Sequence, residues 1–173
     1  AGHAQVQVLD GGYQAAVAAG IPVSSEAKPP QQVSPYPFKA WELPTMTMEE
    51  VAQATKDPDY LVVDVRDAAR YRGEMEPIDL VAGHIPGAVN IPFKTNLGSD
   101  GSFLPPDVLR QKYTLALSGR DNEHVAVHCG SGVTACHTAL AMDYAGLGIP
   151  QLYVGSWSEW SRNDRPIATG AGS

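Results

Sequence analysis

The stretch that decides the fold of this chain reads Val125-Ala126-Val127-His128-Cys129-Gly130-Ser131-Gly132-Val133-Thr134-Ala135. An apolar strand ends on a single cysteine, a loop with two glycines follows, and a helix is predicted over residues 134–145. The free N–H groups and the dipole at the start of such a helix favour an anion. The pattern therefore predicts that Cys129 is presented at a turn as an exposed, reactive thiolate.

On both sides of this stretch, short apolar strands alternate with helices along the chain. The predicted strands cover residues 60–65, 89–92, 123–128 and 152–154. The predicted helices cover residues 47–56, where Thr47 and Glu50 have capping-box spacing, 105–117 and 134–145, with further helical turns in 66–76 and after 155. This order predicts an α/β fold with a mostly parallel central sheet flanked by helices. Ligands of such sheets bind beyond the carboxyl ends of the strands, where Cys129 lies.

Composition excludes several classes of function. The chain has 173 residues, 43% of them hydrophobic and 18% charged, as in ordinary globular domains. Its formal net charge of -7 argues against nucleic acid or an anionic membrane surface as a partner. No apolar run is long enough to span a bilayer. The two cysteines lack paired spacing, which predicts a reducing compartment and hence the cytoplasm.

The N-terminal part reads differently from the rest. Residues 24–40 are rich in proline and glutamine without apolar periodicity, and we expect an extended linker there. Residues 7–13 and 20–23 resemble the end of the chain: the same spacing separates Gly11 from Gly155 and Pro22 from Pro166. This partial repeat predicts that residues 1–23 are the last strand and helix of a preceding copy of the same domain, with the complete copy over 41–173.

Residue types around Cys129 discriminate among the reactions of loop cysteines. A cysteine phosphatase closes its loop with an arginine that binds the phosphoryl oxygens, and Ala135 stands at that position. A papain-like hydrolase needs a positioned histidine base, and the side chain of His128 points to the opposite face of its strand. No metal-ligand spacing is present. Thiol chemistry on sulfur, with the loop amides stabilising a persulfide, fits the pattern best and needs no separate base.

Several separated motifs, in the same order, resemble the C-terminal catalytic domain of tandem-domain rhodaneses and 3-mercaptopyruvate sulfurtransferases. They are Asp64-Val65-Arg66, Arg70-Tyr71-Arg72-Gly73, Gly83-His84-Ile85-Pro86-Gly87-Ala88, Cys129 to Ala135, and Gly155-Ser156-Trp157-Ser158-Glu159-Trp160. The resemblance covers residues 41–170 and implies a rhodanese-like three-layer domain. Residues 8–12 are similar to the end of the inactive N-terminal rhodanese domain.

The resemblance implies a sulfurtransferase without a cofactor or a metal. Sulfane sulfur from a small anionic donor, thiosulfate or 3-mercaptopyruvate, passes through a Cys129 persulfide to a thiol, cyanide or thioredoxin-like acceptor. By the same resemblance Ser131 is a catalytic loop serine beside the sulfur. The residues implied to bind the donor are Arg70, Gly130, Gly132, Val133 and Thr134.

Two departures from this pattern leave an alternative open. Mercaptopyruvate enzymes carry a second arginine shortly before the Gly-His-Ile-Pro turn, whereas residues 76–82 contain none. The loop serine of the family also works with residues of the N-terminal rhodanese domain, which this sequence lacks. The alternative is a weakly active or non-catalytic module that carries sulfur or binds a protein.

Other residues of the motifs have structural interpretations. We expect Asp64 and Arg66 to form a hydrogen-bonded pair and His84 to stabilise its turn from a buried position. Cys136 is interpreted as a small packed hydrophobe. Trp157 and Trp160 are expected to anchor the last helix to the core.

Overall fold

The computed structural model describes residues 5–31 and 33–171 of the chain. Its centre is a parallel sheet with the strand order β1-β5-β4-β2-β3, as the α/β pattern predicts. The strands are β1 (Thr45–Met46), β2 (Leu61–Asp64), β3 (Val89–Asn90), β4 (Val125–His128) and β5 (Gln151–Tyr153). Sequence reasoning missed β1, because a two-residue strand has no periodicity to detect.

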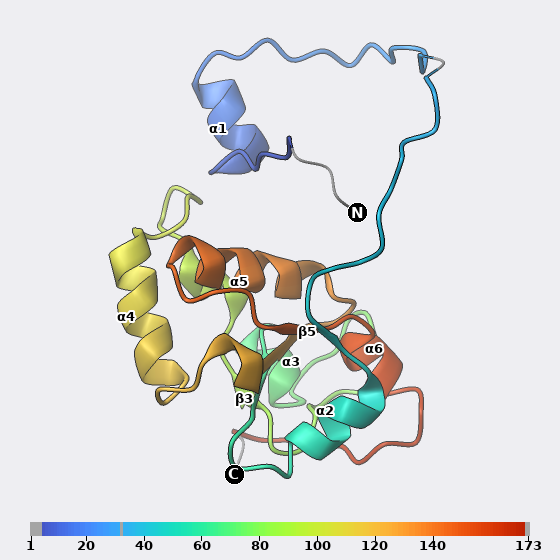
Figure 1. Ribbon diagram of the computed structural model, residues 1–173, viewed down its shortest axis with the longest axis vertical. Coiled ribbons are helices and arrows are strands. Elements are labelled where there is room, and N and C mark those ends of the chain that lie inside the picture. Colours follow the sequence, from blue (N-terminus) through green and yellow to red (C-terminus); the bar gives the residue numbers. More distant parts are fainter. Residues whose placement is uncertain (1–4, 32, 172–173) are drawn as a thin grey trace.

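Helices lie on both faces of this sheet (Figure 1). They are α1 (Gly12–Ala18), α2 (Met48–Ala54), α3 (Ala68–Tyr71), α4 (Pro106–Ala116), α5 (Val133–Tyr144) and α6 (Ser156–Trp160), with 3-10 turns η1 (Phe93–Asn96) and η2 (Asn122–His124). The predicted capping box is present: the Thr47 hydroxyl accepts from the backbone of Glu50, whose carboxylate accepts from the Thr47 N–H. The sequence thus placed the long helices within one or two residues.

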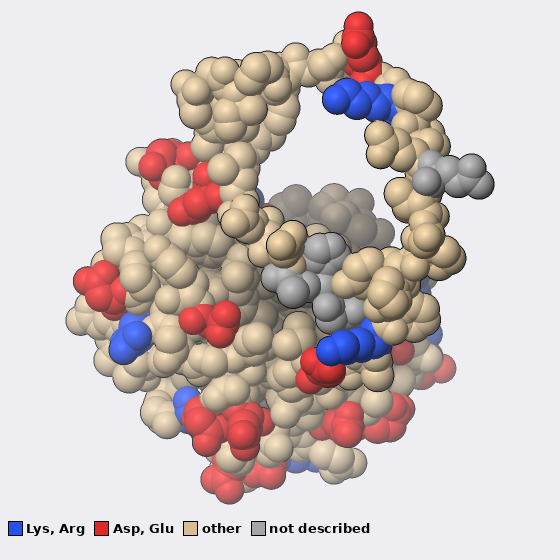
Figure 2. All heavy atoms as spheres, turned by 45° about the horizontal axis from the view of Figure 1, so that its top comes forward, with Lys and Arg blue, Asp and Glu red and all other residues tan. Residues whose placement is uncertain are grey.

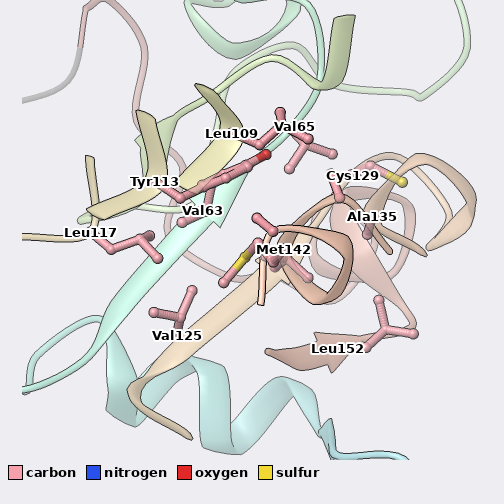
Figure 3. Close-up of a cluster of buried hydrophobic side chains, with 13 residues drawn as sticks. Val63, Val65, Leu109, Tyr113, Leu117, Val125, Cys129, Ala135, Met142 and Leu152 are labelled. Atoms are coloured by element: carbon pink, nitrogen blue, oxygen red, sulfur yellow. The ribbon is translucent and has the colours of Figure 1, made fainter. Parts of the chain in front are cut away.

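Alternate residues of the central strands build two apolar layers, one on each face. On one face Val63 and Val127 pack with α4 and α5, in the cluster that Figure 3 shows. On the other face Val62 and Ala126 pack with α2 and α6. Fully burying a valine side chain contributes on the order of 1.5–3 kcal/mol, so these strands hold the sheet between its helices. The three-layer architecture follows from this two-sided burial.

The segment between α1 and β1 stands away from the sheet domain (Figure 1), whereas residues 6–10 line a pocket together with Phe103 and Tyr144 of that domain. The described residues between α1 and β1 contain no helix or strand, and they arch over the sheet domain as Figure 2 also shows. One tie to the domain is the Phe103 N–H, which donates to Asp10 Oδ1 at 2.8 Å. The predicted remnant, linker and domain also include residues 1–4, 32 and 172–173, which lie outside the described residues.

The charge of the chain is visible on its surface. Figure 2 shows acidic side chains spread over the face in view, with fewer basic ones among them, in line with the net charge of -7. Over the described ranges, no helix has the length and apolar character needed to cross a membrane.

Candidate active site

Cys129 follows directly after β4, at the carboxyl end of the sheet, where the sequence predicts it. Its residue surface is only 2% exposed, so the expectation of an exposed thiol is wrong. The reason is that Cys129 packs beside Ala135 at the end of the core cluster. In addition, the first turn of α6 covers it, because the Trp157 N–H is hydrogen-bonded to the Cys129 carbonyl. In Figure 3 its sulfur points away from the aliphatic side chains and toward the loop that follows β4.

The loop after Cys129 offers a set of free backbone amides. Among the described residues, no N–H group from residue 130 to 134 donates to a backbone carbonyl or a side chain. Helix α5 begins at Val133, so its first amides also lack partners inside the helix. A run of unpaired N–H groups at a helix start is suited to bind an anion. The side chains of Ser131 and Val133 are exposed, and Thr134 is half-buried.

Gly132 gives the loop its shape. Its φ is 83°, and a Cβ atom there would lie 2.9 Å from the Val154 carbonyl oxygen. Gly130 needs no such conformation, and a Cβ atom at Gly130 would meet the Arg70 guanidinium at an ordinary contact distance of 3.6 Å. The sequence predicts the same role in the loop for both glycines, but only at Gly132 does the backbone conformation require glycine.

The turn between β5 and α6 braces Cys129 from both sides of its backbone. The Cys129 N–H donates to Ser156 Oγ at 3.2 Å, and the Ser156 hydroxyl donates to the Tyr153 carbonyl at 2.9 Å. The Trp157 N–H donates to the Cys129 carbonyl at 3.0 Å. Ser156 is buried and has a φ of 54°, a strained conformation for a residue with a Cβ atom.

Arg70, on α3, lies beside the loop, with its guanidinium 3.6 Å from the position of a Cβ atom at Gly130. Its Nε and Nη2 atoms donate to the two carboxylate oxygens of Glu76, at 3.1 and 2.6 Å. Nη2 also lies 3.3 Å from Asp79 Oδ2. Among the described residues Nη1 has no hydrogen-bond partner.

Asp79 and Ser158 connect Arg70 to the cysteine loop. The Ser158 hydroxyl donates to Asp79 Oδ1 at 2.6 Å, while the Ser158 N–H donates to the Gly130 carbonyl at 2.8 Å. Sequence reasoning did not assign a role to Ser156, Ser158, Glu76 or Asp79. A signal existed for the two acids, since residues 76–82 replace an expected arginine with carboxylates beside an arginine-rich segment.

The family of this chain follows from comparison with known proteins. The model of the rhodanese-like domain matches residues 47–163, which include both Arg70 and the cysteine loop. The chain belongs to the rhodanese family.

Curated relatives of this rhodanese carry two kinds of name. A probable 3-mercaptopyruvate sulfurtransferase of Pseudomonas aeruginosa is 45% identical over 168 residues, covering 95% of this chain and 58% of the relative. The human 3-mercaptopyruvate sulfurtransferase is 38% identical and the chicken (Gallus gallus) thiosulfate sulfurtransferase 37%, each over 95% of this chain and 56% of its own length. This chain thus spans a little more than half the length of these relatives.

A solved structure with the same fold is an anaerobic ergothioneine biosynthesis enzyme from Chlorobium limicola, in complex with trimethyl histidine. It superposes on the rhodanese with a TM-score of 0.81 and 25% identity, over 95% of this chain and 41% of that one.

The structural interpretations of Arg66 and His84 are confirmed in this rhodanese. The buried Arg66 donates to both carboxylate oxygens of Asp64 and to the Gly83 carbonyl, and its guanidinium stacks over Trp157. His84 is 1% exposed, and its Nδ1 atom lies 2.7 Å from the Tyr71 carbonyl oxygen. Trp157 and Trp160 are buried in the second apolar layer, as expected of anchors.

His128 does not lie beside the sulfur. Its ring is directed toward Tyr153 and Asp64, with Nε2 3.9 Å from Asp64 Oδ2, whereas Cys129 belongs to the cluster on the other face. Burial lowers the pKa of His128, an effect that the Asp64 carboxylate opposes. The rhodanese therefore has no histidine base in hydrogen-bond contact with Cys129 among its described residues.

Cys136 differs from its expected role. It is exposed on α5 and lines an apolar pocket with Trp41, Leu43 and Leu140, so its interpretation as a small packed hydrophobe is wrong. The helix turns about 100° per residue, so the neighbouring Ala135 faces the core and Cys136 does not. Partial burial, and secondarily Cys129, raise the pKa of the Cys136 thiol.

Proposed function

We propose that this chain is a sulfurtransferase that carries sulfane sulfur on Cys129. The observation that supports the proposal best is the run of unpaired amides from residue 130 to 134, next to the free Nη1 of Arg70. An anionic sulfur donor and a persulfide both place negative charge at such a point, where fixed N–H dipoles stabilise it. Relatives named for 3-mercaptopyruvate and relatives named for thiosulfate both align with this chain.

The reaction takes place in two steps. The Cys129 thiolate attacks the outer sulfur of the donor, forming a new S–S bond. The bond between that sulfur and the rest of the donor breaks, which releases sulfite from thiosulfate or pyruvate, after protonation of its enolate, from 3-mercaptopyruvate. A thiolate or cyanide then attacks the outer sulfur of the persulfide. The Cys129 thiolate leaves, and the acceptor departs as a persulfide or as thiocyanate.

We assign separate tasks to the residues around Cys129 in this proposal. Nη1 of Arg70 binds the anionic group of the donor, while Glu76 holds the rest of the guanidinium in place. The backbone of Gly130, Gly132, Val133 and Thr134 lines the sulfur side. Ser131 makes no hydrogen bond among the described residues, which leaves its hydroxyl free to contact donor or persulfide.

The wider setting of the domain is also a proposal. Residues 1–23 correspond in it to the end of a preceding rhodanese repeat, residues 24–40 to a linker and residues 41–173 to the catalytic domain. The longer relatives support this division, because this chain covers 58% of the first and 56% of the second. A thioredoxin-like acceptor and a cytoplasmic location complete the proposal.

The test is sulfur loading of Cys129. The protein is incubated with thiosulfate or 3-mercaptopyruvate, and its intact mass is measured. We expect a gain of one sulfur, about 32 Da, that a thiol acceptor removes. The gain should be absent in Cys129→Ser and present in the matched control Cys136→Ser. No gain with either donor, or a gain that persists in Cys129→Ser, would contradict the proposal. Loading without turnover would identify a sulfur carrier.

A further inference from the structure

Asp79 is a buried carboxylate at the edge of the cysteine loop. Its side chain is 1% exposed, and its Oδ2 atom lies 3.9 Å from the position that a Cβ atom would take at Gly130. The Ser158 hydroxyl holds it there, and the Ser158 N–H bonds the loop itself. The negative charge of Asp79 is therefore fixed in position next to the place where a donor anion must approach.

The cations near Asp79 are already engaged by other carboxylates. Arg70 meets Glu76 through two hydrogen bonds and reaches Asp79 only through the longer 3.3 Å contact. Arg66 is paired with Asp64 and Glu76. Among the described residues, the remaining cation within ion-pair distance of Asp79 is Arg162, 3.8 Å away with a side chain that is 55% exposed, so solvent weakens its effect. The charge of Asp79 is thus only partly balanced.

From this arrangement we propose that Asp79 determines the donor specificity of Cys129, because it repels the dianion thiosulfate more than the monoanion 3-mercaptopyruvate. The proposal rests on the sulfurtransferase function above and adds a discriminating residue to it. Electrostatic work is proportional to the charge of the ligand. The unfavourable interaction energy with a single fixed carboxylate is therefore twice as large for a dianion as for a monoanion at the same distance.

The size of the effect follows from Coulomb's law. Two unit charges about 6 Å apart in a water-like medium change a rate or equilibrium constant about threefold. A dianion at the same place experiences about a tenfold change. Neutralising Asp79 should therefore raise kcat/KM about threefold for 3-mercaptopyruvate and about tenfold for thiosulfate.

The variant for this test is Asp79→Asn, which keeps the shape of the side chain and an oxygen that accepts from Ser158. In this variant the two hydrogen bonds to Glu76 still hold Arg70 in place. The matched control is Glu74→Gln, which removes the same charge from an exposed carboxylate paired with Arg72. We expect the thiosulfate-to-mercaptopyruvate ratio of kcat/KM to rise about threefold in Asp79→Asn and to stay constant in Glu74→Gln. An unchanged or lower ratio in Asp79→Asn overturns the proposal.

A second measurement reads the charge at Cys129 without any sulfur transfer. Cys129 is alkylated with iodoacetate, a monoanion, and with neutral iodoacetamide, and the modified peptide is quantified by mass spectrometry. The thiolate fraction cancels in the ratio of the two rates. We expect this ratio to rise about threefold in Asp79→Asn only. A constant ratio overturns the role of Asp79. If the ratio rises while the wild-type chain takes up no sulfur, the charge effect stands and the sulfurtransferase function fails.

Discussion

Among single residues, the two glycines that follow Cys129 have different roles. Gly132 has a positive φ and lies close to the Val154 carbonyl, whereas Gly130 stands at an ordinary distance from Arg70. A side chain at Gly132 therefore strains the backbone, and one at Gly130 projects into the proposed donor site. Their substitution separates stability from donor binding.

We predict that Gly132→Ala lowers the free energy of unfolding by about 2 kcal/mol, the cost of a left-handed backbone combined with a close contact. Gly130→Ala should keep the stability within about 1 kcal/mol of the wild type and raise the KM for the anionic donor. Urea unfolding and donor kinetics on the two variants check this. Equal destabilisation by the two variants would contradict the assignment.

At the scale of the elements, the turn from β5 into α6 contains a strained backbone conformation at Ser156, the residue that is hydrogen-bonded to Cys129. Ser156 keeps a φ of 54° because its hydroxyl bonds both the Cys129 N–H and the Tyr153 carbonyl. Ser118, after α4, has the same φ of 54° but is exposed and has no side-chain partner among the described residues. The two serines therefore have the same strained backbone conformation, but only the hydroxyl of Ser156 forms hydrogen bonds among the described residues.

Ser156→Ala should therefore cost about 2 kcal/mol of stability, because it leaves a buried N–H and a carbonyl without their partner. Ser156→Gly should cost about 1 kcal/mol less, since glycine relieves the strain while losing the same bonds. In the control position, Ser118→Ala should be near neutral and Ser118→Gly stabilising. The prediction is wrong if Ser156→Ala and Ser118→Ala have the same effect in chemical unfolding.

At the scale of the whole molecule, the buried His128 and the half-buried His137 make stability depend on pH. Burial lowers the pKa of His128, and burial together with Lys112 lowers that of His137. Each stays neutral in the folded state and takes up a proton when the chain unfolds below the ordinary histidine pKa of about 6.5. Stability is therefore complete above that pH and decreases as the pH falls toward the lower folded-state values. His124 acts in the opposite direction, because its hydrogen bond to Asp121 raises its pKa.

We predict that the free energy of unfolding decreases between pH 6.5 and 5.5, with a slope approaching about 1.4 kcal/mol per pH unit for each histidine that stays neutral. His128→Gln should reduce this slope, and the control His124→Gln should not. Unfolding curves at several pH values measure it. A slope that is the same in His128→Gln and the wild type would refute the role of His128.

Much of the architecture was predictable because it depends on local patterns. Apolar runs predicted β2 and β4, the Thr47–Glu50 capping box predicted α2, and the strand-cysteine-glycine order placed Cys129 at the carboxyl end of the sheet. The domain division into residues 1–23, 24–40 and 41–173 stays a prediction. The motif of Arg70 predicted a donor-binding residue, which stays a prediction; its position beside the loop comes from the structure.

The α/β order of elements and the place of Cys129 after a strand were readable from the amino-acid sequence, since they follow from residue type and short-range periodicity. The burial of Cys129, the hydrogen bonds of Ser156 and Ser158 to its loop, and the contacts of Asp79 and Glu76 with Arg70 could be found only in the folded molecule. The contacts of Ser156 and Ser158 join segments 27 and 79 residues apart in the chain, and those of Arg70 depend on how residues 72–79 fold back on α3. Their energies depend on distance and burial, which exist only after the sheet has brought its strand ends together.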